Sequence, residues 1–315
     1  MNKEIKPIII LGPTATGKSA LAVELAKKMN GEIISADSMQ VYRGMDIGTA
    51  KPTIEERQGI AHHLIDVRDP DEEWTVSDFI ERANGLTGKL ANEGKTPIIV
   101  GGTGLYLWSL IEGFSFPITP ADKELRAKLE KEPLVYLHSR LAAVDLEAAA
   151  KIHPNDKKRI IRALEVYTLT GKPISQLQKL RMEPETKRLG SIEEEPRRLA
   201  AGSYLLIGLN LPRDQLYERI NKRVDEMMDK GLIDEVNGLR GKGYGRELIS
   251  MQALGYKEVI DYLENKYTKD EMIEELKKRT RNFARRQMTW FRRFKDVSWR
   301  DACSATLLGD IIGAV

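Results

Sequence analysis

A glycine-rich segment near the start of the chain offers a binding site for phosphate. It reads Gly12-Pro13-Thr14-Ala15-Thr16-Gly17-Lys18-Ser19 and matches the pattern G-x-x-x-x-G-K-[ST] between an apolar run and a helical pattern. The backbone N–H groups of such a loop converge on phosphate oxygens, and the Lys18 ammonium and the helix N-terminus add positive charge. The Ser19 hydroxyl can reach an accompanying Mg²⁺ ion. The segment therefore predicts a site for a di- or triphosphate with Mg²⁺.

Two further polar side chains each follow an apolar run. Asp37 comes directly after residues 33–36, and Thr103 follows the run 97–100 in a Gly-Gly-Thr-Gly turn. A carboxylate beside a phosphate site can bind Mg²⁺ or accept a proton from a nucleophile. The alternative for Asp37 is a turn or helix cap. The Thr103 hydroxyl either meets an entering group or stands in the turn for backbone reasons.

The usual partner of such a phosphate loop in nucleotide hydrolysis is missing. That partner is an aspartate that binds Mg²⁺ at the end of an apolar strand. The run 97–100 ends in glycines instead, and the nearest substitute is the short segment Leu64-Ile65-Asp66. The absence of a strand-end aspartate counts against an ordinary ATPase.

The elements that must position these residues alternate between strands and helices. The apolar patterns predict strands over 7–11, 33–36, 97–100 and 204–209, and helices over 18–29, 76–91, 213–230, 252–264 and 269–295. Such alternation predicts an α/β fold, a P-loop NTPase-like core with a parallel sheet flanked by helices. Ligands of these sheets bind at the carboxyl ends of the strands, so the phosphate loop, Asp37 and Thr103 should face one crevice.

The middle of the chain has a different character. From about residue 119 to 171 the pattern is helical with little strand signal, and residues 177–202 are polar and interrupted by prolines, as in an exposed connector. We therefore predict a catalytic core from residues 1–114 and 203–315 and a helical insertion domain from residues 115–202.

Charge is distributed unevenly along the chain. Residues 1–114 hold 12 Lys and Arg against 16 Asp and Glu, a net charge of −4; because the whole chain carries +3, residues 115–315 carry +7. A basic second half suggests a polyanionic partner. The hydrophobic share of 41%, the single cysteine and the absence of a long apolar segment predict a soluble protein of the reducing cytoplasm without a membrane contact.

The last long predicted helix is strongly basic. Residues 277–295 contain nine Lys and Arg and no Asp or Glu. Its aromatic side chains form an apolar stripe at helical spacing: Phe283, Trp290, Phe291 and Phe294. Basic side chains lie to another side: Arg281, Arg285 and Arg292. Such a helix can pack by one face and offer the other to RNA phosphates, although a solvated surface is the ordinary alternative. Lys157, Lys158, Arg159 and Arg162 can supply a second basic patch.

Several segments together resemble a known family. Besides the phosphate loop, they are ISADSMQVYRGMDIGTAKP (34–52), HHLID (62–66), GGTGLY (101–106), DKKRIIRALEV (156–166), QALGYKE (252–258) and RQMTWF (286–291). They are similar to the bacterial tRNA dimethylallyltransferases, also called tRNA isopentenyltransferases. The resemblance covers nearly the whole chain apart from 177–202 and the tail after about 297. One departure is Thr16, where the family commonly has serine; both residues supply a hydroxyl.

The resemblance implies a reaction and a set of partners. The exocyclic N6 of the adenosine at position 37, next to the anticodon of a tRNA, attacks C1 of dimethylallyl diphosphate and releases diphosphate, with Mg²⁺ as cofactor. The catalytic candidates are Asp37 as general base, with Thr16, Lys18 and Arg223. By resemblance, the residues that contact the tRNA are Asp37, Ser38, Met39, Gln40 and Thr103. The basic patches add the tRNA-binding candidates Arg159, Arg162, Arg281 and Arg285, so we expect the insertion domain to contact tRNA as well. Nothing in the sequence suggests an interface between subunits, so we expect a monomer.

Two points stay open at the level of sequence. Arg219 and Arg223 lie four residues apart on one face of the helix 213–230, so either can reach the diphosphate, and we favour Arg223. The activity also has two alternatives, a P-loop kinase for a small molecule or nucleoside, and a non-catalytic RNA-binding module controlled by a nucleotide. The four histidines have no partners at ligand spacing, so we expect structural or hydrogen-bonding roles for them.

Overall fold

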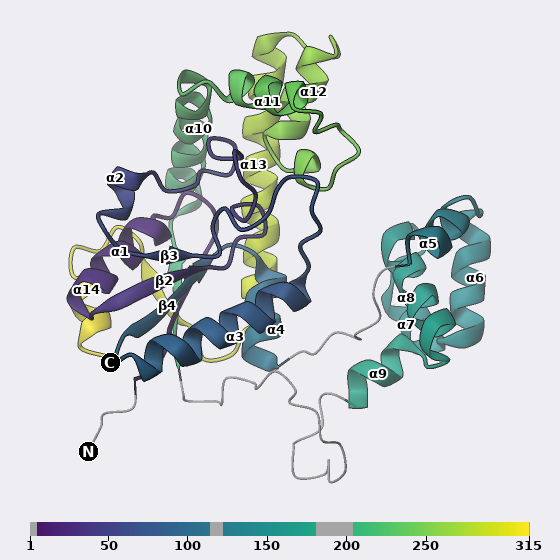
Figure 1. Ribbon diagram of the computed structural model, residues 1–315, viewed down its shortest axis with the longest axis horizontal. Coiled ribbons are helices and arrows are strands. Elements are labelled where there is room, and N and C mark those ends of the chain that lie inside the picture. The colour runs from purple at the N-terminus through teal and green to yellow at the C-terminus, as the bar shows by residue number, and fades with distance from the viewer. Residues whose placement is uncertain (1–4, 114–121, 181–203, 315) are drawn as a thin grey trace. The chain divides into compact units, whose positions relative to one another are not determined.

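The computed structural model describes residues 5–113, 122–180 and 204–314 (Figure 1). These residues form two compact units: residues 5–113 and 204–314 make the first, and residues 122–180 make the second. The predicted boundaries at 114/115 and 202/203 lie outside the described residues.

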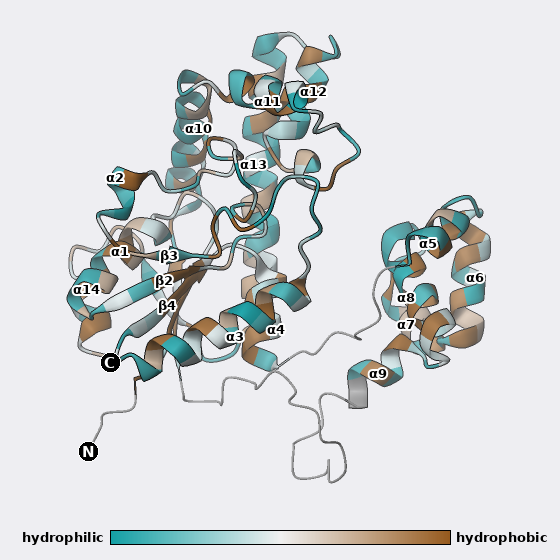
Figure 2. Cartoon of the chain, in the orientation of Figure 1, coloured by the Kyte–Doolittle hydropathy of each residue, from teal (hydrophilic) through white to brown (hydrophobic). Residues whose placement is uncertain are grey.

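The first unit is built on a parallel sheet. Its described strands run in the order β3 (His62–His63), β2 (Gly31–Ser35), β4 (Thr96–Gly101), β1 (Ile8–Leu11), β5 (Leu205–Asn210) and β6 (Ser298–Asp301), and every pair is parallel. Strands β1 and β4 are buried along their whole length, which explains their continuous apolar sequence. Figure 2 shows hydrophobic residues gathered in the middle of the sheet, at strand β4. The predicted parallel α/β fold is confirmed.

Helices cover both faces of this sheet. Helix α1 (Lys18–Lys28) and helix α14 (Leu307–Ile312) share one hydrophobic cluster with alternate strand residues, among them Ile8, Ile10 and Ile98. Successive strand side chains point to opposite faces, so the intervening residues Ile9 and Ile99 face the other side. Helices α3 (Val76–Asn92) and α4 (Gly104–Glu112) pack together there (Figure 1).

The remaining described elements of the first unit are helical. They are α2 (Ile54–Arg57), α10 (Arg213–Asp229), α11 (Leu232–Gly241), the short 3₁₀ helix η2 (Ser250–Gln252), α12 (Tyr256–Leu263) and α13 (Lys269–Phe291). Helices α10 and α13 pack against each other, and α13 also reaches α4. Both long helices agree with the predicted ranges 213–230 and 269–295 to within a few residues.

The second unit is helical throughout its described residues. It consists of α5 (Lys123–Glu130), α6 (Leu134–Val144), α7 (Leu146–Lys151), α8 (Lys157–Thr170) and α9 (Ile174–Leu180). Leucine and isoleucine side chains such as Leu137 and Ile160 form its core. The Glu165 carboxylate is also fully buried there, where the Arg126 and Arg162 guanidinium groups bind it at 2.8 and 2.5 Å.

The structure corrects two predicted elements. The helix predicted over 252–264 starts only at Tyr256, because the chain passes through a left-handed conformation at Gly255 (φ 95°) that no continuous right-handed helix can contain. The connector predicted over 177–202 begins too early, since residues 177–180 belong to helix α9. The rest of that connector lies outside the described residues.

The backbones that follow strands β2 and β4 lie very close together at the carboxyl ends of these strands. A Cβ atom at Gly101 would lie 2.2 Å from the Ala36 carbonyl oxygen, whereas one at Gly88 in helix α3 would meet no atom within 4 Å. Gly101→Ala should therefore lower the free energy of unfolding by about 2 kcal/mol or more. Gly88→Ala should raise it by about 0.5–1 kcal/mol, because alanine is the better helix former. Urea unfolding followed by circular dichroism measures both, and a Gly101→Ala protein as stable as its parent would contradict the packing.

Candidate functional site

A cavity of about 750 Å³ lies at the carboxyl ends of β1, β2 and β4. The phosphate loop lines it with Thr14, Lys18 and Ser19, and the loops after β2 and β4 line it with Asp37 and Thr103. Helices α10 and α13 complete the wall with side chains that include Arg223, Phe283, Arg286 and Gln287. The three strand-end loops thus face one crevice, as the strand order requires.

The phosphate loop is held by hydrogen bonds within itself. The Lys18 ammonium donates to the Pro13 carbonyl at 2.6 Å, and the Thr16 hydroxyl donates to the same oxygen at 2.9 Å. Thr16 is buried and is not among the residues that line the cavity, so its predicted catalytic role stays a prediction. Burial deep among protein atoms, with Arg223 nearby, lowers the pKa of Lys18 to about 7, although Asp37 opposes the shift.

The Asp37 carboxylate is anchored through one oxygen. Its Oδ1 accepts from the backbone N–H groups of Met39 and Gln40 at 2.9 and 3.4 Å. The turn role that the sequence allowed is therefore real, and it coexists with a place in the cavity wall. Within the described part of the chain, no hydrogen-bond donor contacts Oδ2. Burial raises the pKa of Asp37 despite those two N–H groups and the nearby Lys18 and Arg223, so this carboxylate is a stronger base than usual.

Thr103 connects the third loop to the second. Its Oγ1 accepts from the Ser38 backbone N–H at 3.0 Å and makes no side-chain cap to helix α4. The hydroxyl is therefore placed toward the Asp37 loop and the cavity. Ser38, Met39 and Gln40 line the same cavity.

The structure separates the two arginines of α10. Arg223 Nη1 donates to Thr14 Oγ1 at 3.1 Å, and burial lowers the pKa of its guanidinium while Asp37 partly offsets that effect. The exposed Arg219 contacts the Cys303 sulfur at 3.2 Å. Arg223 is the arginine that touches the phosphate loop, which supports our preference for it.

A second cavity of about 600 Å³ adjoins the first. Both are lined by Lys18, Ser19 and Arg223, and the second also by Arg219 and Lys222. The phosphate loop is therefore reached from two sides. Ser19 is exposed to both cavities and fits the predicted Mg²⁺ role, because Mg²⁺ is commonly held by one or two protein oxygens, substrate phosphates and water. Among the described residues, no group of three or more His, Cys, Asp and Glu side chains is placed to hold a metal ion.

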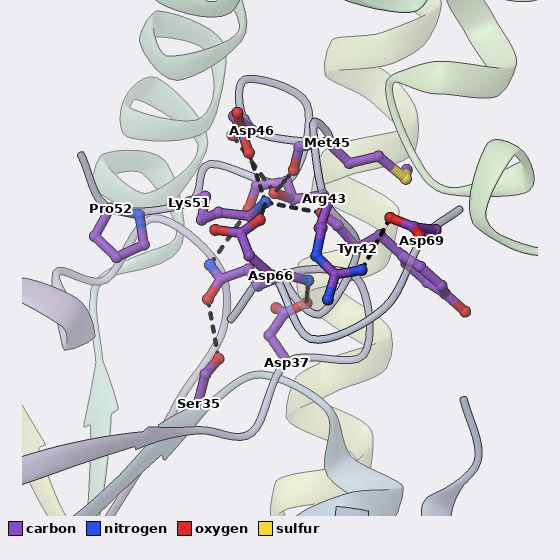
Figure 3. A network of polar contacts seen from close by, with 12 residues as sticks. Ser35, Asp37, Tyr42, Arg43, Met45, Asp46, Lys51, Pro52, Asp66 and Asp69 are labelled. Carbon is purple, nitrogen blue, oxygen red and sulfur yellow. Dashed lines mark hydrogen bonds and ion pairs between the residues drawn. The ribbon is translucent and has the colours of Figure 1, made fainter. Parts of the chain in front are cut away.

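The loop that carries Asp37 is stabilised by a buried lysine (Figure 3). The Lys51 ammonium, 3% exposed as a side chain, donates to the Tyr42 carbonyl at 2.8 Å and to the Asp46 and Asp66 carboxylates at 2.5 and 2.6 Å. Asp66, the weak candidate for an NTPase Mg²⁺ ligand, is thereby paired with Lys51 and lines neither cavity. That pairing further disfavours an ordinary ATPase site.

Helix α13 presents a face to the cavity that the sequence analysis did not select. The side chains that line it recur at helical spacing: Arg279, Asn282, Phe283, Arg286 and Gln287. The predicted pair lies elsewhere: Arg281 donates to Asn221 Oδ1 at 2.6 Å, and Arg285 is exposed and bonds Asn282 at 3.1 Å. The spacing i, i+3, i+4, i+7 is the signal that identifies this face, whereas the aromatic spacing alone places Phe283 in the packing stripe.

The remaining candidates have other surroundings. In the second unit Arg159 pairs with Asp156 at 3.3 Å, and Arg162 binds the buried Glu165. Their predicted contacts with tRNA stay predictions. His62 Nδ1 lies 2.9 Å from the Ile60 carbonyl, and His63 Nε2 lies 2.6 Å from Glu32, which agrees with the hydrogen-bonding roles expected for them.

Comparisons with known proteins identify the family. The family model described as IPP transferase matches residues 40–294. The tRNA dimethylallyltransferase of Acetivibrio thermocellus is 50% identical over 93% of this chain and 90% of that protein. The structure also resembles the tRNA isopentenylpyrophosphate transferase of Bacillus halodurans, with 43% identity, a TM-score of 0.69 and coverage of 99% and 96% of the two chains.

A more distant solved structure has the same arrangement. It is a eukaryotic dimethylallyltransferase acting on tRNA, with 29% identity and a TM-score of 0.81 over 98% of this chain and 80% of that one. The described helices of this chain include none with the length and apolarity that a membrane span requires. The family match, the identity to curated relatives and the P-loop site together show that this chain belongs to the IPP transferase family.

Proposed function

We propose that this protein transfers a dimethylallyl group from dimethylallyl diphosphate to N6 of the adenosine at position 37, next to the anticodon of a tRNA. One observation carries the proposal: Asp37 shares a cavity with Lys18 and Arg223, so a proton acceptor stands beside a cradle for a departing diphosphate. The relatives named tRNA dimethylallyltransferase support the donor and the acceptor.

The residues supply the two halves of a substitution. The N6 lone pair forms a bond to C1 of the donor while the C1–O bond breaks and its electrons leave with diphosphate. Asp37 Oδ2 takes the proton that N6 loses, which is the kind of positioned base that contributes about 10²–10⁴-fold. Lys18, Arg223 and the loop N–H groups stabilise the negative charge that grows on the leaving oxygen.

Mg²⁺ is part of this proposal. Ser19 would hold it through its hydroxyl, and the ion, when bound, neutralises part of the diphosphate charge. Since both cavities reach Ser19, the ion has access together with the diphosphate.

The two cavities suit the two substrates. The smaller includes the phosphate-loop residues Gly17, Lys18 and Ser19 and would take the diphosphate there, beside Arg223. The larger is lined by Thr103 and Phe283, which offer a hydroxyl and an aromatic ring to an adenine that has left its stack. Arg286 lies over the Phe283 ring, 5.9 Å from its centroid, at a place where it can meet the RNA backbone. The monomeric state stays a prediction.

One incubation tests the reaction. The protein is mixed with dimethylallyl diphosphate labelled in the prenyl group, Mg²⁺ and unmodified tRNA, and the tRNA is digested to nucleosides. Label on N6 of the adenosine next to the anticodon is the expected result. Phosphate transfer from ATP without prenylation would instead indicate the kinase, and RNA binding without turnover would indicate the binding module.

The Asp37→Asn substitution isolates the base. Asparagine keeps an oxygen for the Met39 and Gln40 N–H groups but accepts no proton, so kcat should fall by about 10²–10⁴-fold while the tRNA Kd changes less than about threefold. The exposed Asp71→Asn is the matched control and should behave as the parent. Single-turnover prenylation and filter binding measure the two quantities. An unimpaired rate would remove Asp37 from this role.

The lowered pKa of Lys18 predicts a basic limb in the pH profile. The lysine of the free protein loses its proton as pH rises through about 7, so kcat/KM for dimethylallyl diphosphate should fall above that pH. The bound diphosphate favours the ammonium form, so kcat should stay nearly constant to a higher pH. In Lys18→Arg, which stays charged, the fall in kcat/KM between pH 7 and 9 should disappear. The same limb in both proteins would show that another group titrates.

A further inference from the structure

A buried glutamine of helix α13 joins two of the loops that line the site. Gln287 is 5% exposed. Its Oε1 accepts from the Thr14 backbone N–H at 2.9 Å, and its Nε2 donates to the Gly102 carbonyl at 2.9 Å. The reversed amide would place two donors together and two acceptors together, so a single orientation satisfies both contacts.

Each of the two groups that this amide binds is connected to a residue of the proposed reaction. Thr14 is also held through its hydroxyl by Arg223, on the side of the departing diphosphate. Gly102 precedes Thr103, whose hydroxyl accepts from the Ser38 N–H beside Asp37, on the side of the entering base. A single side chain therefore stands between the two halves of the cavity.

The surroundings leave this amide little freedom. A Cβ atom at Gly102 would lie 2.4 Å from Gln287 Nε2, and one at Gly104 would lie 2.7 Å from the Trp290 Cβ. Helix α13 thus packs directly on the backbone of the Thr103 loop. A shift of that loop must move Gln287, and through it the Thr14 N–H.

We propose that Gln287 is a positioning residue that keeps the diphosphate loop and the Thr103 loop in register, so that donor and acceptor stand in line for the transfer. The proposal rests on the proposed function. Misplacement of reacting groups by about 1 Å can cost about 10²-fold in rate, whereas the contacts that bind each substrate separately remain. Loss of Gln287 should therefore act on kcat more than on KM.

Two substitutions and one control test it. Gln287→Met keeps the length of the side chain and removes both hydrogen bonds; Gln287→Glu keeps the acceptor for Thr14 and loses the donor to Gly102. Thr289→Val is the control, because Thr289 is exposed on the same helix and its hydroxyl bonds the Arg285 carbonyl of that helix. The readouts are kcat and KM for both substrates, with the melting temperature as the measure of folding.

For Gln287→Met and Gln287→Glu we expect a loss of about 10–100-fold in kcat and at most about threefold changes in the KM for tRNA. Thr289→Val should match the parent. If either folded Gln287 variant keeps the parental kcat, or if KM for tRNA rises as much as kcat falls, the proposal is wrong. A parent protein that prenylates no tRNA would instead refute the proposed function, so the two failures are distinguishable. Should Gln287→Met not fold, Gln287→Glu alone decides.

Discussion

The site depends on three charges that are kept partly out of water at one edge of a parallel sheet. Two cations, Lys18 and Arg223, lie there, and burial lowers the pKa of each. The negative charge of Asp37 opposes both shifts and so offsets part of the free-energy cost of burying the two cations. The excess positive charge is relieved when an anion enters, so the empty protein favours a diphosphate before any specific contact is counted. The same burial raises the pKa of Asp37 and makes its carboxylate a stronger base.

A loop without regular structure holds the carboxylate, and two charged side chains, the buried Lys51 and the partly exposed Glu235, bind it in place of a neighbouring strand. Lys51 binds the loop through the Tyr42 carbonyl and the Asp46 carboxylate. From helix α11, Glu235 accepts from the backbone N–H groups of Asp46, Ile47 and Gly48 at 2.7–3.1 Å. These contacts satisfy backbone groups that a β ladder would otherwise bind, and they make the position of Asp37 depend on residues far along the chain.

Much of this arrangement could be predicted from local patterns. The buried strands, the phosphate loop and the convergence of Asp37 and Thr103 follow from apolar runs and from the rule for parallel sheets. The contact of Gln287 with Thr14 joins residues 273 positions apart, and no periodicity reports such a pairing. The face of α13 that lines the cavity could not be identified for a related reason: aromatic spacing shows that the helix is amphipathic, and only the fold shows that Phe283 lines a cavity. Gly255 delays to Tyr256 the start of a helix that the sequence pattern begins at residue 252.

The strand order has a consequence for synthesis of the protein. Strand β1 is made first, yet its two neighbours are β4, at residues 96–101, and β5, at residues 205–210. A nascent chain on the ribosome therefore carries one unpaired edge of β1 until residues 205–210 have been added. Helix α13, which forms part of the cavity wall, is synthesised later still. A ribosome that stalls before that helix emerges would release a fragment with an open edge and no closed pocket.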